Sequence, residues 1–152
     1  MKITMRGQTL ALVLLCSLWG FADTVLLEGT GLTRTVTLKA KDVVKIEAVE
    51  NALTLIGSGD LLHVDGSDNT IEVRGGLNGI VITGSGNQVT VRGRLGQLDV
   101  RGCDNQLLLE GECQLIQYGG SDNVTRWKQK PGSKPPKVER MGWNNQFVVI
   151  TP

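Results

Sequence analysis

The sequence predicts an all-β protein, a β-solenoid similar to a parallel β-helix, in which each turn of the coil takes about 18 residues. Phrases of the form Gly-x-x-Asn begin at Gly66, Gly84, Gly102 and Gly120, so the interval between them is constant, and a fixed period indicates a repeat architecture. Alternating apolar runs recur every nine residues, which is typical of two half-buried strands per turn. The chain has 20 glycines and only 4% aromatic residues. We therefore expect about six turns, each with two nine-residue halves.

The first segment, residues 1–22, is interpreted as a signal peptide. Lys2 and Arg6 precede a short apolar run, and small residues stand at Ala22 and two positions before it, as a signal peptidase requires. The apolar run is shorter than the roughly 20 residues that span a bilayer. We expect export to the periplasm, the cell surface or the medium, with no transmembrane segment in the mature chain. Lipidation of Cys16 stays open.

Loss of Lys2 and Arg6 leaves 14 basic residues against 15 acidic ones, from 16 and 15 in the whole chain. A nearly neutral protein gives no electrostatic case for binding nucleic acid. Envelope polysaccharides or proteins are the expected partners, and no cofactor is expected.

Residues 23–47 are predicted to form an N-terminal cap or an irregular first turn, and residues 48–152 the repeats. Within a turn, one strand follows the Asn, as with Ile71 and Val73, and a second comes nine residues later, as with Ile80 and Ile82. Glycines separate the two strands because corners need residues that tolerate positive φ.

Asparagines recur at one position of every turn and are predicted to stack in a column. A side-chain amide both donates and accepts hydrogen bonds, so such a column can bond within itself and to the corner backbone. This structural ladder comprises Asn51, Asn69, Asn87, Asn105, Asn123 and Asn145.

The late part of the chain resembles a known family. The phrase GSDNVTRW from Gly120 to Trp127, an insertion containing Pro136-Lys137-Val138, and the closing GWNN from Gly142 to Asn145 are similar to bacterial exported proteins grouped as domain of unknown function 3060. The resemblance covers roughly residues 53–149. It implies an exported β-solenoid-like domain without an assigned activity and without catalytic residues to transfer. The sequence departs from the usual pattern at Trp143, where Ser is commoner, and at Gly86, where an acidic residue is usual.

Two binding chemistries of solenoids are disfavoured by the pattern. Calcium-binding β-rolls need a regular Gly-Gly-x-Gly-x-Asp corner, whereas the position before the ladder Asn varies, reading Glu50, Asp68, Gly86, Asp104, Asp122 and Asn144. Ice-binding solenoids present arrays of Thr, and no such array continues here. We expect no metal site.

Catalysis on carbohydrate is the alternative function, as a small envelope enzyme. It needs a base, a charge stabiliser and a cleft, and the candidates are the lone His63 and a mixed-sign patch of Glu72, Arg74, Arg92 and Glu110. Ion pairs between turns explain the patch without a substrate. We therefore predict a module without catalytic residues.

Cys103 and Cys113 are predicted to remain free of each other. They flank one strand and so lie in opposite corners, roughly 17–20 Å apart, whereas a disulfide needs Cα atoms within about 7 Å.

A basic, Pro-rich insertion at residues 127–141 breaks the period and is the candidate site for a partner. One interpretation is a solvated loop whose aromatic ends cap the last turn. The other is a docking site for an anionic surface polymer or a protein. The candidate partner-binding residues are Trp127, Lys128, Lys130, Lys134, Lys137, Arg140 and Trp143.

The final strand, Gln146 to Ile150, is a candidate edge for pairing with another copy. Together these observations predict an exported structural or binding module of the bacterial cell envelope.

Overall fold

The computed structural model describes residues 2–3 and 24–151. Apart from Lys2–Ile3, the predicted signal peptide lies outside these residues, as does Cys16. The described residues form strands and connecting corners without a helix, so they also contain no helix that could cross a bilayer.

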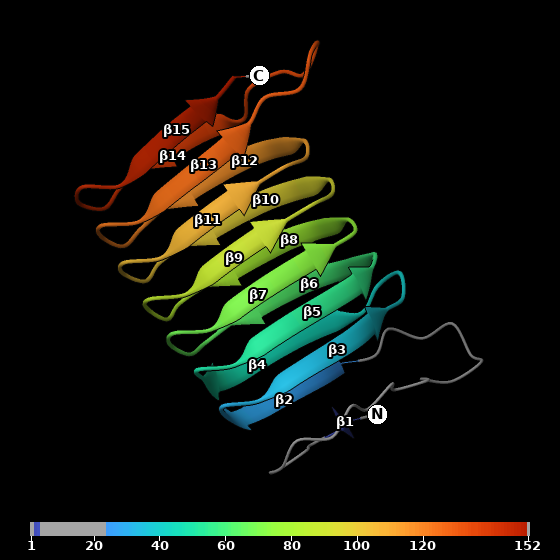
Figure 1. Cartoon of the computed structure of the whole chain (residues 1–152). Coiled ribbons are helices and arrows are strands. Elements are labelled where there is room, and N and C mark those ends of the chain that lie inside the picture. Colours follow the sequence, from blue (N-terminus) through green and yellow to red (C-terminus); the bar gives the residue numbers. More distant parts are fainter. Residues whose placement is uncertain (1, 4–23, 152) are drawn as a thin grey trace.

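Two parallel sheets face each other across the coil (Figure 1). The first sheet holds, in order, β1 (Lys2–Ile3), β2 (Thr24–Thr30), β4 (Val43–Val49), β6 (Gly59–Val64), β8 (Leu77–Ile82), β10 (Leu95–Val100), β12 (Cys113–Tyr118) and β14 (Lys137–Arg140). The second sheet holds, from the other end, β15 (Gln146–Ile150), β13 (Val124–Lys128), β11 (Gln106–Leu109), β9 (Gln88–Val91), β7 (Thr70–Arg74), β5 (Ala52–Gly57) and β3 (Thr33–Leu38). The predicted β-solenoid is therefore confirmed.

The register follows the repeat of the sequence. Ile71 pairs with Val89, and Val89 pairs with Leu107, which is the same step of 18 that joins one ladder asparagine to the next. The first step is one residue longer, since Thr24 pairs with Val43, and the last is four residues longer, since Val124 pairs with Gln146. Residues 24–47, expected as a cap or an irregular first turn, form β2, β3 and the start of β4. They supply one more turn than the six expected, giving a second sheet of seven strands.

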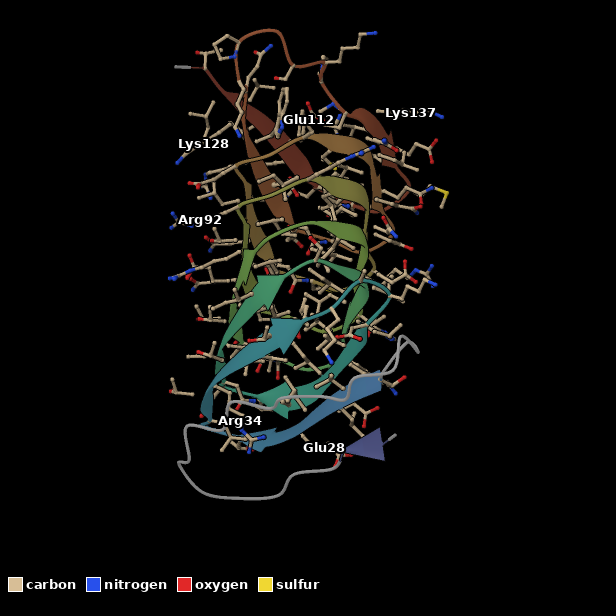
Figure 2. All side chains as sticks on the ribbon, turned by 90° about the vertical axis from the view of Figure 1, so that its right-hand side faces the viewer. Glu28, Arg34, Arg92, Glu112, Lys128 and Lys137 are labelled. Atoms are coloured by element: carbon tan, nitrogen blue, oxygen red, sulfur yellow. The ribbon has the colours of Figure 1, made fainter. Side chains whose placement is uncertain are left out.

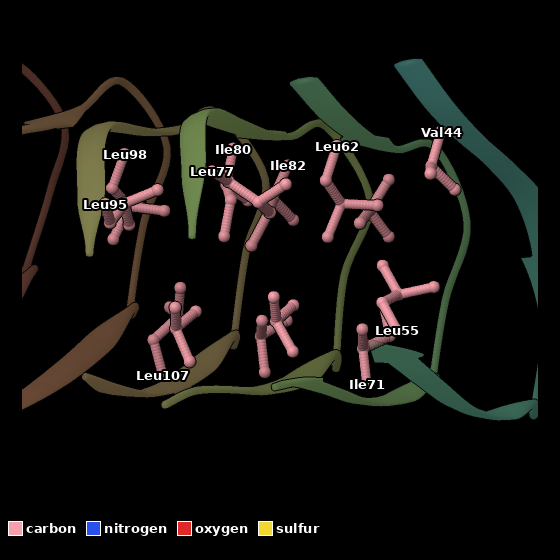
Figure 3. Close-up of a cluster of buried hydrophobic side chains, with 14 of the residues drawn as sticks. Val44, Leu55, Leu62, Ile71, Leu77, Ile80, Ile82, Leu95, Leu98 and Leu107 are labelled. Atoms are coloured by element: carbon pink, nitrogen blue, oxygen red, sulfur yellow. The ribbon is translucent and has the colours of Figure 1, made fainter. Parts of the chain in front are cut away.

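Apolar side chains from the two sheets meet in one continuous core (Figure 3). Leu62, Ile80 and Leu98 come from successive strands of the first sheet and are fully buried. Leu55 and Ile71 face them from the second sheet. Small aliphatic side chains fill this narrow interior, which explains why the sequence needs so few large rings.

The asparagine ladder is formed as predicted. The Asn87 side chain, which is fully buried, donates from Nδ2 to Asn105 Oδ1 (3.1 Å) and to the Gly66 carbonyl (2.9 Å). Its own Oδ1 accepts from the backbone N–H and Nδ2 of Asn69 (3.1 and 3.0 Å). The same pattern repeats at Asn51, Asn69, Asn105 and Asn123 and ends at Asn145. Each inner amide thus satisfies a backbone carbonyl and a backbone N–H of the corner and also bonds to the amides on either side.

The residue before each ladder asparagine adopts a left-handed conformation. Its φ is 56° at Asp68, 67° at Gly86 and 53° at Asn144. Asp, Asn and Gly are the residues that tolerate this region best. The backbone thus explains the residue type at five of the six positions, including Gly86, and Glu50, with a φ of 58°, is the exception.

The glycine two residues earlier is required by close stacking. A Cβ on Gly102 would lie 1.7 Å from the Gly84 carbonyl oxygen of the preceding turn. Only glycine lets these two corners approach within one strand spacing.

Candidate binding surface at the basic insertion

The insertion joins β13 to β14 and projects beyond the C-terminal end of the coil (Figure 1). Its tip, Lys130 to Ser133, is a hydrogen-bonded turn in which the Ser133 N–H donates to the Lys130 carbonyl (3.0 Å). Pro131 precedes Gly132, whose φ is 78°, an order typical of a type II turn. The Ser133 hydroxyl also donates to the Lys130 carbonyl (2.6 Å), which fixes this tip.

Trp127, one of the candidate partner-binding residues, is buried. Only 1% of it is exposed, its Nε1–H donates to the Gly111 carbonyl (2.9 Å), and its ring stacks on Phe147 with centroids 6.5 Å apart. Pairing places Trp127 beside the inward Leu109. Trp127 therefore stabilises the last turns and does not belong to the candidate surface.

Lys128 ends a chain of ion pairs that runs across successive turns beside the second sheet. Its Nζ lies 2.5 Å from Glu110, whose other oxygen lies 3.8 Å from Arg92. Arg92 and Arg74 both contact Glu72 at 2.8 Å. Figure 2 shows Arg92 and Lys128 projecting from the same side of the coil. The mixed-sign patch is thus a set of ion pairs between turns, as expected.

These contacts lower the pKa of both carboxyl groups. At Glu72 the hydrogen bond from Arg74 is the largest cause of the lowered pKa, and at Glu110 it is the hydrogen bond from Lys128. Both groups therefore remain charged, and their cationic partners are partly neutralised.

Lys130 and Lys134 are exposed and form no ion pair among the residues that the structure describes. Lys130 borders a hollow of about 610 Å³ at the base of the insertion. The hollow is lined by Arg92, Glu110, Lys128, Gln129, Lys130, Pro131, Ile150 and Thr151. A second hollow of about 240 Å³ shares Lys130 and Pro131. The insertion thus shapes a concave surface with uncompensated positive charge.

The remaining candidates lie away from this hollow. Lys137 pairs with Glu139 (2.6 Å) on β14, and Arg140 is exposed at the end of that strand. Trp143 is 78% exposed in the corner between β14 and β15, which is the opposite corner from the insertion. The structure therefore divides the predicted surface: Lys128 and Lys130 line the hollow, and Lys134 is exposed further along the insertion.

Sequence reasoning missed Ile150, and it named Arg92 only in the mixed-sign patch without connecting it to the insertion, although both residues line the hollow. A signal existed for one side of it, because Arg92, Glu110 and Lys128 follow one another at the interval of the repeat. It also missed a groove of about 630 Å³ on the outer face of the first sheet, lined in part by Gly76, Asn78 and Gln97.

The candidates for catalysis do not share a site. His63 is half-buried on β6 in the first sheet, between Lys45 and Val81 of the neighbouring strands. Glu72 and Arg92 lie on the side of the second sheet. The core separates them, so no base and charge stabiliser of the proposed kind converge.

The two cysteines flank β11 as predicted from the repeat, and both are free. Cys103 is exposed, whereas Cys113 is buried in the core. Burial raises the pKa of the Cys113 thiol to about 11, which keeps it protonated and unreactive. In the part of the chain that the structure covers, no three His, Cys, Asp or Glu side chains cluster as metal ligands would.

Comparison with protein families matches the chain to one described as "Protein of unknown function (DUF3060)", over residues 46–95 and 82–144. No curated protein and no solved structure matches the chain. The two matched segments together span residues 46–144, well over half of the sequence, and include both the ladder and the insertion. The chain belongs to the DUF3060 family.

Proposed function

We propose that this protein is an exported, non-catalytic binding module of the bacterial cell envelope, which holds an anionic polysaccharide at the basic insertion. The observation that carries the proposal is the pair of lysines, Lys130 and Lys134, that lack an acidic partner among the described residues. Lys45, Lys128 and Lys137, by contrast, each pair with a glutamate. Lys130 also borders the hollow of about 610 Å³.

The geometry suits a polymer better than a small molecule. The hollow is open and lies beside the charged column formed by Arg92, Glu110 and Lys128. Carboxylate groups spaced along a chain would meet several cations at once, and weak contacts add through multivalency. The insertion joins the solenoid between β13 and β14, at the corner opposite the asparagine ladder, and hydrogen bonds between Ser133 and Lys130 fix its tip.

Export is supported by the N-terminal pattern of Lys2, Arg6 and an apolar run that ends before Ala22. Expression of the full chain, followed by cell fractionation and intact mass measurement, tests it. The proposal expects the protein outside the cytoplasm, beginning at Asp23. Recovery of an uncleaved cytoplasmic chain would contradict it.

Binding is tested with alginate as the anionic probe and dextran as the neutral one, using protein purified after expression of the full chain. Lys130→Gln combined with Lys134→Gln is expected to weaken alginate binding at least about fivefold, because two carboxylate-binding charges are lost. The matched control is Lys45→Gln with Arg101→Gln, which removes the same charge from the side of the first sheet.

The control is expected to bind like the wild type. Equal loss in both variants would show attraction by net charge alone, and equal binding of dextran and alginate would remove the charge argument. Either result would reject the insertion as the site.

A further inference from the structure

We infer that the C-terminal end of the coil is a self-complementary interface, through which two copies pair by antiparallel alignment of their β15 strands. This inference does not rest on the proposed polysaccharide site. It begins from the position of β14 and β15, which are the outermost strands of their sheets at this end (Figure 1). A strand at an open edge presents unpaired backbone groups to another chain.

Exposed apolar residues gather at this end. Val148 and Val149 of β15 are 39% and 42% exposed, and Met141 is 86% exposed in the preceding corner. Val149 continues a buried column, because it pairs with Trp127, which is 1% exposed. Val149 is thus an inward residue that lacks a covering turn.

The backbone of β15 determines which residues can bond to a new strand. Gln146 donates its N–H to the Asn123 carbonyl (2.8 Å), and the Ile150 carbonyl accepts from Gln129 (3.0 Å), so both residues face the chain of β13. Backbone groups alternate in direction along a parallel strand. Phe147 and Val149 therefore turn their N–H and C=O groups toward the open edge.

One antiparallel register uses the whole strand and satisfies these groups. A two-fold axis at Val148 places Phe147 opposite Val149 of the second copy, and Val149 opposite its Phe147. Both residues carry edge-facing backbone groups, so each pair can exchange two hydrogen bonds. Both side chains also point inward, so the two cores would join with apolar contacts on both sides of the axis.

The other sheet is compatible with this arrangement. Lys137 and Glu139 alternate with Val138 on β14. An antiparallel pairing about Val138 brings Lys137 of one copy opposite Glu139 of the other, which unites opposite charges. Hydrogen bonding, apolar packing and charge at the C-terminal end therefore suit a second copy of this chain. The pairing requires the insertion, which projects beyond this end (Figure 1), to lie beside the joined strands.

Among the residues that the structure describes, the opposite end offers no equivalent surface for a head-to-tail contact. There the Leu32 N–H donates to Asn51 Oδ1 (2.6 Å), so the first amide oxygen of the ladder already has a hydrogen-bond partner. Arg34 stands in the inward column beside Leu53. A charged residue in that column would face the apolar Phe147 of a following copy, so pairing through like ends is favoured and stops at two copies.

The test measures the mass of the purified protein in solution across a dilution series. We expect a dimer for the wild type. Val148→Lys is expected to raise the dissociation constant at least about tenfold, because two ammonium groups would meet at the axis. The control Thr54→Lys adds the same charge at the outward position of β5 in the same column and is expected to leave the dimer intact.

A cross-linking variant tests the register itself, in a Cys103→Ser background that removes the exposed native thiol. Val148→Cys is expected to form an intermolecular disulfide, because residues at a non-hydrogen-bonded antiparallel position have Cα atoms about 4.5 Å apart. Gln146→Cys is expected not to do so, since its two copies would lie roughly 13 Å apart along the strands. A monomeric wild type, a dimer that persists in Val148→Lys, or equal cross-linking at both positions would overturn the inference.

Discussion

The two ends of the coil differ in how they finish the same repeat. In the first turn the inward residues Val36 and Leu38 are 9% and 5% exposed, and Arg34 stands in the next inward position of the strand. In the last turn Val149 remains 42% exposed. Figure 2 places Arg34 at one end and Lys137 near the other.

This difference shows how a solenoid limits its own assembly. Every inner turn is covered by a neighbour, so only the ends must be protected against edge pairing. At the N-terminal end Arg34 places a charged residue in an inward column, whereas the C-terminal end presents an apolar strand. Unlike ends of this kind disfavour open-ended filaments and favour a closed pair.

The largest expected difference between an inner and a terminal position concerns the two tryptophans of the repeat region. Trp127→Ala is expected to lower the free energy of unfolding by about 4 kcal/mol, since it removes a large buried side chain from the core. Trp143→Ala is expected to change it by less than about 0.5 kcal/mol, since Trp143 is exposed. Urea denaturation at one protein concentration measures both. Similar losses would contradict the assignment of Trp127 to the core.

The asparagine ladder gives the next largest difference. Asn87→Ala is expected to cost about 3 kcal/mol, because it leaves the Gly66 carbonyl and the Asn69 N–H without partners in a buried corner. Asn145→Ala is expected to cost about 1 kcal/mol, because Asn145 is only half-buried and water can replace its bonds. The same denaturation experiment compares them, and an equal cost at both positions would show that burial does not set the strength of the ladder.

The sequence predicted most of what repeats and little of what does not. The constant interval between the Gly-x-x-Asn phrases was enough to derive the coil, the two strands per turn and the column of Asn51 to Asn145. The same interval places Trp127 beside Leu109 and so indicated its burial, but its position at the edge of the insertion suggested a surface role. Trp127 is buried because strand pairing continues through β13, so the residue keeps the inward position that the repeat gives it. The insertion begins only after this strand.

The hollow at the insertion could not be derived, because it depends on how the loop at residues 129–136 folds back toward Ile150. No periodic signal describes that path. The sequence also did not show that the first turn is one residue longer than the inner turns. Residues 24–47 carry no ladder asparagine, and Leu32 stands in its place.

The smallest expected effect concerns the ion pairs between turns that run from Arg74 to Lys128. They do not continue into the last turn, because Lys128 pairs there with the apolar Ile150. The pKa of Glu72 is lowered mainly by its hydrogen bond from Arg74. A carboxyl group whose pKa is lower in the folded state stabilises the fold above its unfolded pKa, near 4.5, and loses this contribution as the pH falls through the folded value. Glu72→Gln is therefore expected to reduce stability at neutral pH by less than either ladder substitution, since surface ion pairs contribute little and salt screens them.

Once the pH falls below the lowered pKa of Glu72, Glu72→Gln and the wild type are expected to converge in stability, which urea denaturation across pH measures. Thr54→Gln, one turn earlier in the same outward column, places the same amide where no ion pair exists and is expected to show no such pH dependence. A difference between Glu72→Gln and the wild type that persists at low pH would assign the effect to packing of the side chain. Packing of the Glu72 side chain, and not its charge, would then account for its contribution to the stability of the inner turns.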